Sequence, residues 1–316
     1  MLINPQSLLN HKMASVNDEI AFQMSPYFTL YKDGRIERLR GPESAPNSDD
    51  PDAAVWSKDV VVEPETGVSV RLFLPKLTDA DKKLPLVIYI HGGAFVIGSA
   101  RSEVFHSFIS SIAEKAKVIA VSVEYRLAPE HALPIAYDDS WLAFQWIMSH
   151  SDGLGPEPWL NNHADFSNIF LGGESAGANI AHDVAIRAGN SADFKDDRKM
   201  SGLFLVHPFF GGKDEDKLYK FLCPSSSARD DDPRLNPAAD PRLAQMPCKK
   251  VVFHVAENDF LLARAKAYYE ALKSSPWKGE VEILEIEGEG HGFHLINPSH
   301  PKAGIVTQDL VTFFTS

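Results

Sequence analysis

The sequence contains little cysteine. Only Cys223 and Cys248 occur among 316 residues, and two cysteines cannot form a disulfide framework in a chain of this length. The N-terminus has no basic stretch followed by an apolar run, as a secretory signal would, and no apolar run approaches the roughly 20 residues of a membrane helix. These absences predict a cytoplasmic protein that uses no membrane, with Met13 as an alternative start.

Positive charge is also scarce, as are motifs that hold phosphate or metal. The chain has 43 acidic and 31 basic side chains, which give a formal net charge of −12. Such a charge repels phosphate backbones and anionic lipid surfaces. The sequence has no H-E-x-x-H or C-x-x-C spacing, no phosphate loop and no glycine-rich dinucleotide loop. We therefore expect no nucleic-acid partner, no cofactor and no metal ion, while monomer and homodimer both stay open.

The remaining composition is that of a soluble globular protein. Apolar residues make up 44% and charged residues 23%, which suffices for a large core. Because α/β architectures of more than about 250 residues often form one unit, we expect residues 1–316 to be a single domain. Residues 1–50 are poor in regular pattern, and the cluster of Pro, Ser and Asp at 41–54 predicts a loop. We expect residues 1–50 and 213–217 to form a cap or lid.

From residue 58 onward, strand and helix patterns alternate. The runs 58–63 and 68–74, joined by a turn, predict a hairpin. Short, nearly continuous apolar runs predict parallel strands buried on both faces at 85–91, 118–124, 169–174, 202–207 and 250–256, and a last strand at 281–288. The gaps predict helices at 107–115, 135–149, 176–188, 261–274 and from 301. This alternation predicts an α/β fold with a mostly parallel central sheet and helices on both faces.

The segment Gly173-Glu174-Ser175-Ala176-Gly177 is the strongest single motif. A lone G-x-S-x-G is weak, but here it follows a buried strand and opens a helix, which is the context of a nucleophile elbow. The helix N-terminus behind Ser175 also favours developing negative charge. Ser175 is therefore the candidate nucleophile. The alternative is a serine that caps the helix in a glycine-rich turn.

A second glycine-rich turn, His91-Gly92-Gly93-Ala94-Phe95, directly follows the strand at 85–91. Attack on an ester creates an oxyanion, and backbone N–H groups without neighbouring side chains are good preorganised donors for it. Gly92 and Gly93 can supply two such groups, and Ala176, after the nucleophile, a third. We expect His91 to form a hydrogen bond with the loop backbone rather than to act in catalysis.

The acid and the base should follow Ser175 in that order along the chain. Asp259 follows the strand at 250–256 and lies further along its loop than Glu257, so it is the preferred acid; its alternative role is to cap the next helix. His291 has a glycine on each side after the last strand, which predicts an exposed imidazole and the role of general base. His294 resembles the start of a packed segment, and we expect three other histidines to be core residues: His182, His207 and His254.

Together these residues resemble the hormone-sensitive-lipase group of α/β hydrolases. The similarity rests on the motifs at 91–95, 124–130 with Pro134, 138–139 and 173–177. Within that group, residues 25–39 and 163–182 are similar to the plant carboxylesterase branch. The resemblance covers nearly the whole chain from Met13.

This resemblance implies the α/β-hydrolase fold and the hydrolysis of small esters of xenobiotics, hormones or specialised metabolites, with an N-terminal segment over the pocket. Gibberellin receptors resemble the branch but lack the catalytic histidine, so His291 disfavours a receptor. Related dehydratases and cyclases use the pocket for elimination or cyclisation, and several have threonine at the nucleophile; Ser175 and the intact Gly92-Gly93 favour the esterase while such a lyase stays the alternative. The segment between Gly212 and Leu218 is about ten residues shorter than the resemblance leads us to expect, and if that segment walls the acyl pocket, substrate size does not carry over.

Overall fold

The computed structural model describes residues 18–25, 27–38, 44–77, 82–191 and 200–316. The chain divides into two compact units, residues 1–41 and 42–316, and each is described by itself. The boundary falls at the start of the predicted loop 41–54. One domain with a cap made from residues 1–50 stays a prediction, and part of that segment lies outside the described residues.

The first unit contains a three-stranded antiparallel sheet in the order β1-β2-β3. Its strands are β1 (Ile20–Met24), β2 (Phe28–Tyr31) and β3 (Ile36–Arg38). The rings of Phe22 and Phe28 lie 5.8 Å apart between the first two strands. A small sheet thus forms within a segment whose sequence is poor in regular pattern. Alternating apolar residues at 20, 22 and 24 are the period-two signal that the sequence did carry.

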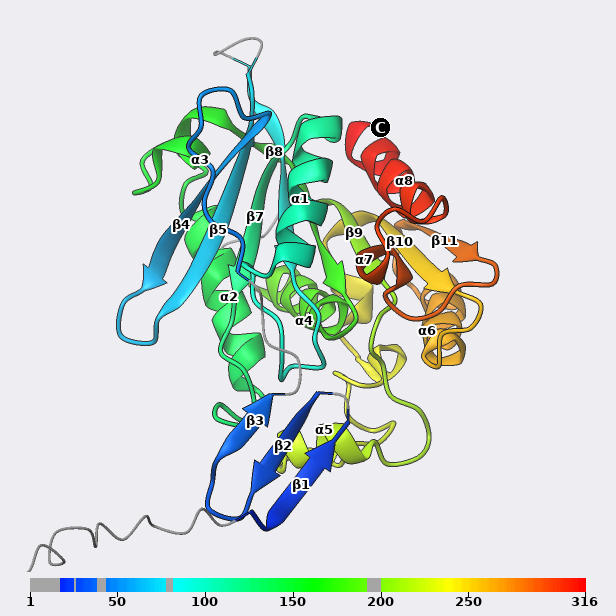
Figure 1. The fold of residues 1–316 in the computed structure, drawn as a ribbon. Helices are drawn as coiled ribbons and strands as arrows, with labels where there is room; N and C mark the ends of the chain where they lie inside the picture. Colours follow the sequence, from blue (N-terminus) through cyan, green and yellow to red (C-terminus); the bar gives the residue numbers. More distant parts are fainter. Residues whose placement is uncertain (1–17, 26, 39–43, 78–81, 192–199) are drawn as a thin grey trace, which may run out of the picture. The chain divides into compact units, whose positions relative to one another are not determined.

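An eight-stranded sheet lies at the centre of the described part of the larger unit (Figure 1). Its order is β11-β10-β9-β8-β6-β7-β5-β4. β5 pairs antiparallel with β4 and with β7, and all other neighbours are parallel. The strands are β4 (Val55–Glu63), β5 (Val68–Pro75), β6 (Leu84–Ile90), β7 (Ile119–Glu124), β8 (Ala164–Glu174), β9 (Met200–Val206), β10 (Cys248–Ala256) and β11 (Glu280–Ile286). The predicted hairpin and the mostly parallel α/β sheet are confirmed.

Helices cover both faces of this sheet (Figure 1). One face carries α1 (Glu103–Ala116), α7 (Phe293–Ile296) and α8 (Ala303–Thr315), whose buried residues join one core cluster with the sheet. The other carries α2 (Ile135–Met148), α4 (Ala176–Asn190) and α6 (Leu262–Ser274). Two short helices, α3 (Pro158–His163) and α5 (Lys217–Leu222), lie in connections. None of the helices in the ranges described above is long and apolar enough to cross a membrane.

The central strands are buried on both faces, which is why they read as continuous apolar runs. Every residue of β5 is buried, and so are six of the seven residues of β6. Parallel strands end at the same edge of a sheet, so the loops after β6, β8, β9, β10 and β11 meet there. The fold therefore brings the predicted site residues to one edge.

Candidate active site

Ser175 lies at a sharp turn between β8 and α4. Its backbone has φ 54° and ψ −116°, a region that residues with side chains rarely adopt. Its N–H donates to the carbonyl of Val206 at 2.9 Å, which ties the turn to β9. A Cβ at Gly177 would lie 2.0 Å from the carbonyl oxygen of Ile90, so only glycine allows this close approach. The backbone strain holds the Ser175 hydroxyl at the sheet edge.

Three predicted residues meet in a hydrogen-bonded chain. Nδ1 of His291 and Oδ2 of Asp259 lie 2.8 Å apart, and Nε2 of His291 and Oγ of Ser175 lie 2.9 Å apart. When Nδ1–H donates to the Asp259 carboxylate, Nε2 is left unprotonated and accepts the serine hydroxyl. This tautomer is the one that a general base requires.

The second carboxylate oxygen of Asp259 makes a local bond. Its Oδ1 accepts the N–H of Leu261 at 2.8 Å, in the turn before α6. The N-cap residue of α6 is Leu261, and no side chain caps that helix, so the alternative prediction that Asp259 caps it is wrong. Glu257 does not take part in the hydrogen bonds between Asp259, His291 and Ser175. Its Oε2 accepts the N–H of Gly288 instead, at 2.7 Å.

The buried acid and the half-buried base each shift the pKa of the other toward its charged form. Burial raises the pKa of Asp259, but the hydrogen bond and the charge of His291 outweigh it and lower that pKa below its ordinary value. Burial acts to lower the pKa of His291, but the hydrogen bond to Asp259 and the charges of Glu174 and Asp259 raise it overall. The site is thus built to accept a proton on His291.

The predicted oxyanion donors lie on two loops beside this chain. Gly93 has φ 111°, and a Cβ there would lie 2.0 Å from the carbonyl oxygen of Ile97. Within the described residues, the N–H groups of Gly92, Gly93 and Ala176 are not found to donate to another protein atom. Ala176 is the first residue of α4, where N–H groups have no partner inside the helix. Such N–H groups can bind negative charge.

The other histidines for which the sequence predicts a role do not take part in the hydrogen bonds from Asp259 through His291 to Ser175. Nδ1 of His91 lies 2.8 Å from the carbonyl oxygen of Gly92, and its ring stacks on Tyr125 at 4.2 Å, so its predicted structural role is confirmed. His182 and His294 are buried, and burial lowers their pKa values to about 4 and about 3. His254 is buried as well and lies 2.8 Å from Asp309.

Sequence reasoning missed two residues that face His291. His207, at the end of β9, has φ 44° and accepts the N–H of Gly292 on Nδ1 at 3.0 Å. Oε1 of Glu174 lies 3.7 Å from Nε2 of His291. Glu174 stands at the variable position of the motif, and the only sequence signal was a charged residue at the end of a buried strand.

Three residues at the site, His207, Asp259 and His291, lie close enough together to suggest a metal site, but their proximity has a simpler explanation. In the described part of the chain, atoms of His207, Asp259 and His291 that could bind a metal lie within 4.8 Å of one another. The hydrogen bonds from Asp259 through His291 to Ser175 already account for that proximity. Absence of a metal and of a cofactor stays a prediction.

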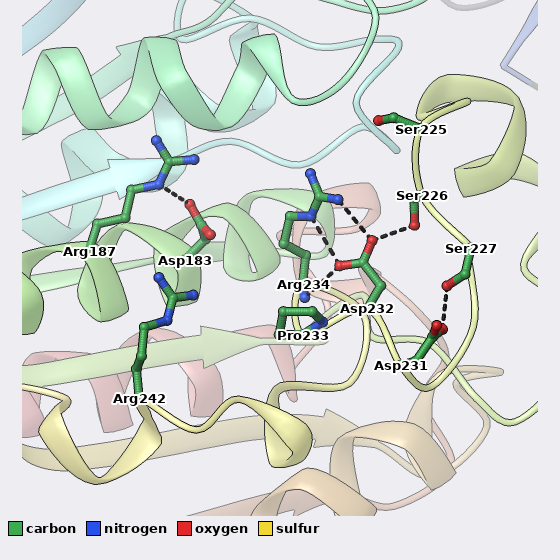
Figure 2. A pocket seen from close by; sticks show the side chains of 10 residues that line it. All are labelled: Asp183, Arg187, Ser225, Ser226, Ser227, Asp231, Asp232, Pro233, Arg234 and Arg242. Carbon is green, nitrogen blue, oxygen red and sulfur yellow. Dashed lines mark hydrogen bonds and ion pairs between the residues drawn. The ribbon is translucent and has the colours of Figure 1, made fainter.

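Among the pockets of the described residues, two differ clearly in character. A pocket of about 250 Å³ lies beside His291 and is lined by Glu289, Gly290, His291, Phe293, Ile296, Asn297 and His300. A pocket of about 590 Å³ is lined by three arginines, three aspartates, three serines and Pro233 (Figure 2). No predicted site residue lines the larger pocket.

Comparison with known proteins agrees with this geometry. A model of the alpha/beta hydrolase fold matches residues 87–295. The chain belongs to the α/β-hydrolase family. This α/β hydrolase is 44% identical to "Probable carboxylesterase 5" of Arabidopsis thaliana, over 91% of this chain and 96% of that protein. It is 42% identical to "Tuliposide A-converting enzyme 1, chloroplastic" of Tulipa gesneriana, over 98% of this chain and 82% of that protein. These relatives place it in the plant carboxylesterase branch.

Solved structures share the fold of this α/β hydrolase. An esterase of Pyrobaculum calidifontis, 23% identical, has a TM-score of 0.67 over 82% of this chain and 84% of that one. Carboxyl esterase 2 of Tuber melanosporum, 20% identical, also has a TM-score of 0.67, over 87% and 89%.

The prediction of a cytoplasmic location is wrong. The finding that contradicts it is the names of the tulip relatives, which are chloroplastic or amyloplastic enzymes. The prediction rested on the absence of a secretory signal and of disulfides. Neither absence separates the cytoplasm from a plastid.

Proposed function

We propose that this α/β hydrolase is a carboxylesterase that forms an acyl-enzyme on Ser175, with His291 as general base and Asp259 orienting the ring. The hydrogen-bonded chain from Asp259 through His291 to Ser175 carries the proposal. Relatives named carboxylesterases, at 41% and 44% identity, support ester hydrolysis.

The proposed reaction has two halves. His291 takes the proton of the Ser175 hydroxyl while the oxygen attacks the ester carbonyl, and the N–H groups of Gly92, Gly93 and Ala176 bind the resulting oxyanion. The imidazolium then gives its proton to the departing alcohol. Water attacks the acyl-enzyme with the same base, and the carboxylic acid is released.

The surroundings of His291 favour a small ester with an apolar alcohol part. The leaving oxygen must come within hydrogen-bond reach of Nε2, so the alcohol lies on the side of His291. The ring of Phe260 packs 5.2 Å from that imidazole and is 72% exposed. Ile296, which is 73% exposed, lines the adjacent pocket of about 250 Å³. Exposed apolar side chains beside a reacting group favour an apolar partner.

We further propose a substrate from plant specialised metabolism, converted in a plastid without nucleic acid, membrane or cofactor. The names of the tulip relatives support this setting. A lyase that uses the same pocket remains the second candidate function.

Covalent labelling separates these functions. A fluorophosphonate should modify the wild-type chain stoichiometrically on the peptide that contains Ser175, and Ser175→Ala should lose both labelling and turnover of a short-chain aryl acetate. Asn179→Ala, in the same helix, should retain labelling. A wild-type chain that resists the label, or an alanine variant that still converts a hydroxylated or acetylated plant metabolite at full rate, would favour the lyase and contradict the esterase.

A further inference from the structure

Glu174 places a second carboxylate at the catalytic ring. It directly precedes Ser175 and is 5% exposed. Its Oε1 lies 3.7 Å from Nε2 of His291, while Asp259 lies 2.8 Å from Nδ1. Each ring nitrogen therefore has a carboxylate within 4 Å, although the hydrogen bond at Nε2 is made with Ser175. The proposed reaction has so far used only one of them.

The Glu174 carboxylate lies between two loops of the site. A Cβ added to Gly92 would lie 2.1 Å from Oε2 of Glu174, and one added to Gly292 would lie 3.5 Å from Oε1. One oxygen thus packs against the oxyanion loop and the other against the loop that carries His291. A carboxylate held from two sides keeps its distance from Nε2 fixed.

On the basis of the proposed function, we infer that Glu174 is a positioning residue that acts through His291. It stabilises the imidazolium from the Nε2 side each time His291 accepts a proton, during acylation and again during deacylation. It forms no bond to substrate. Asp259 sets the tautomer from the other nitrogen.

The charges around Glu174 support this role near neutral pH. Burial raises the pKa of Glu174 to about 7, with His291 acting to lower it and Asp259 to raise it. Tyr89 and Tyr125 also face it, and burial raises their pKa values well above the ordinary one, so both stay neutral. Each of the two groups shifts the pKa of the other, so Glu174 and His291 titrate as a coupled pair.

The sign of the effect on pH dependence follows from the charge. Ionised Glu174 raises the pKa of His291, and only neutral His291 acts as base. Removal of that charge lowers the pKa of His291, so activity persists to lower pH. The same removal deprives the imidazolium of a partner and lowers the maximal rate.

The test compares pH profiles of kcat and kcat/KM on a neutral aryl acetate. Glu174→Gln should move the acidic limb of kcat/KM to lower pH by roughly 0.5–1 unit and lower kcat about tenfold or more. Asp183→Asn is the matched control, because Asp183 is 8% exposed on the helix that follows the elbow and pairs with Arg187. It should leave both readouts within about twofold of wild type.

A second variant keeps the test informative if Glu174→Gln does not fold. Glu174→Asp keeps the charge but withdraws it from Nε2 by about one C–C bond, so it should shift the limb in the same direction by less. The role of Glu174 would be overturned if the acidic limb of the kcat/KM profile stayed in place in both Glu174 variants, or if it shifted equally in Asp183→Asn. Fluorophosphonate labelling separates the two proposals: a labelled Ser175 with unmoved limbs rejects only the inference, whereas an unlabelled wild type rejects the esterase itself.

Discussion

Two carboxylates of the larger pocket, those of Asp183 and Asp232, face guanidinium groups, whereas those around Ser175 face an imidazole. In the pocket, Asp232 pairs with Arg234 at 2.9 Å and Asp183 with Arg187 at 2.7 Å (Figure 2). Around Ser175, both Glu174 and Asp259 approach His291. The sequence repeats Asp-Pro-Arg at 232–234 and 240–242, and each repeat forms the same clamp of arginine on aspartate.

The difference lies in the partner's ability to give up its proton. Arginine keeps its charge at every relevant pH. Burial raises the pKa of Asp232, but the hydrogen bonds and the charge of Arg234 outweigh burial. The pKa of Asp232 is therefore below its ordinary value. Imidazole titrates near neutral pH and can pass protons. Volume is therefore no guide here, because ion pairs line the larger pocket while His291 lines the smaller one.

The largest difference between the two regions should appear when one carboxylate in each is neutralised. Asp259→Asn should lower kcat on an aryl acetate by about 10³–10⁴-fold, because the amide favours the wrong tautomer of His291. Asp232→Asn should leave kcat of the folded protein near wild type. Glu257→Gln is the control within the same loop. If Glu257→Gln lost most of its kcat while Asp259→Asn stayed active, Glu257 and not Asp259 would be the acid.

Stability should respond in the opposite way. Arg234→Ala leaves the buried Asp232 without its guanidinium, so the free energy of unfolding at pH 7 should fall by roughly 2–3 kcal/mol. The pKa of Asp232 is lowered in the folded state, so this stability is present above the unfolded pKa of about 3.9 and is lost as pH falls through the folded value. Urea unfolding at pH 7 and pH 3 should show the difference from wild type shrinking at pH 3. Equal differences at both pH values would mean that packing, not charge, stabilises the clamp.

The sheet and the elbow could be predicted because their signals are local. Continuous apolar runs predict strands buried on both faces, and strand, serine and helix adjoin in the sequence around Ser175. Helix ends are less well specified: α1 begins at Glu103 rather than at 107. Glu103 and Val104 at its start are exposed, so apolar spacing does not mark the first residues of the helix.

The role of Glu174 could not be predicted because it depends on a distant contact. Ser175 and His291 are separated by 116 residues, and no local pattern says which carboxylate will face the ring. The Asp-Pro-Arg repeats were visible in the sequence, yet only the fold brings Arg234 and Arg242 to one pocket with Asp183. The three residues of the hydrogen-bonded chain could be predicted from motifs and their order in the sequence, whereas the contacts of Glu174 and of the arginine pocket required the fold.

A smaller effect should sharpen the contrast between the apolar rim and the charged pocket. Phe260→Ala removes the ring packed on His291, so KM for an aryl ester should rise about three- to tenfold, since an aromatic contact contributes roughly 0.5–1.5 kcal/mol. KM for a small aliphatic ester should change less. Leu154→Ala provides the control, because Leu154 is also exposed and apolar but lies outside the site. Similar KM changes on both esters would argue against a contact with the alcohol part.

The smallest effect is expected at His294, which is close to the active ring but outside its chemistry. The raised pKa of His291 means that the rate on a neutral ester should fall as pH decreases through a value above the ordinary 6.5. Burial lowers the pKa of His294 to about 3, so this ring stays neutral across that range. Neither ring nitrogen of His294 has a hydrogen-bond partner among the described residues, and leucine of similar size should fit there.

His294→Leu should therefore leave kcat and the acidic limb unchanged within error. Its stability should differ instead: the unfolded chain binds a proton on His294 below about pH 6.5 while the folded chain does not until about pH 3, so wild type loses stability as pH falls through this window. The leucine variant should lose less over the same window. Measuring pH–rate profiles beside urea unfolding at pH 7 and pH 5 tests both parts. A limb that moves in His294→Leu but not in Glu174→Gln would show that the buried histidine, rather than the second carboxylate, sets the proton affinity of His291.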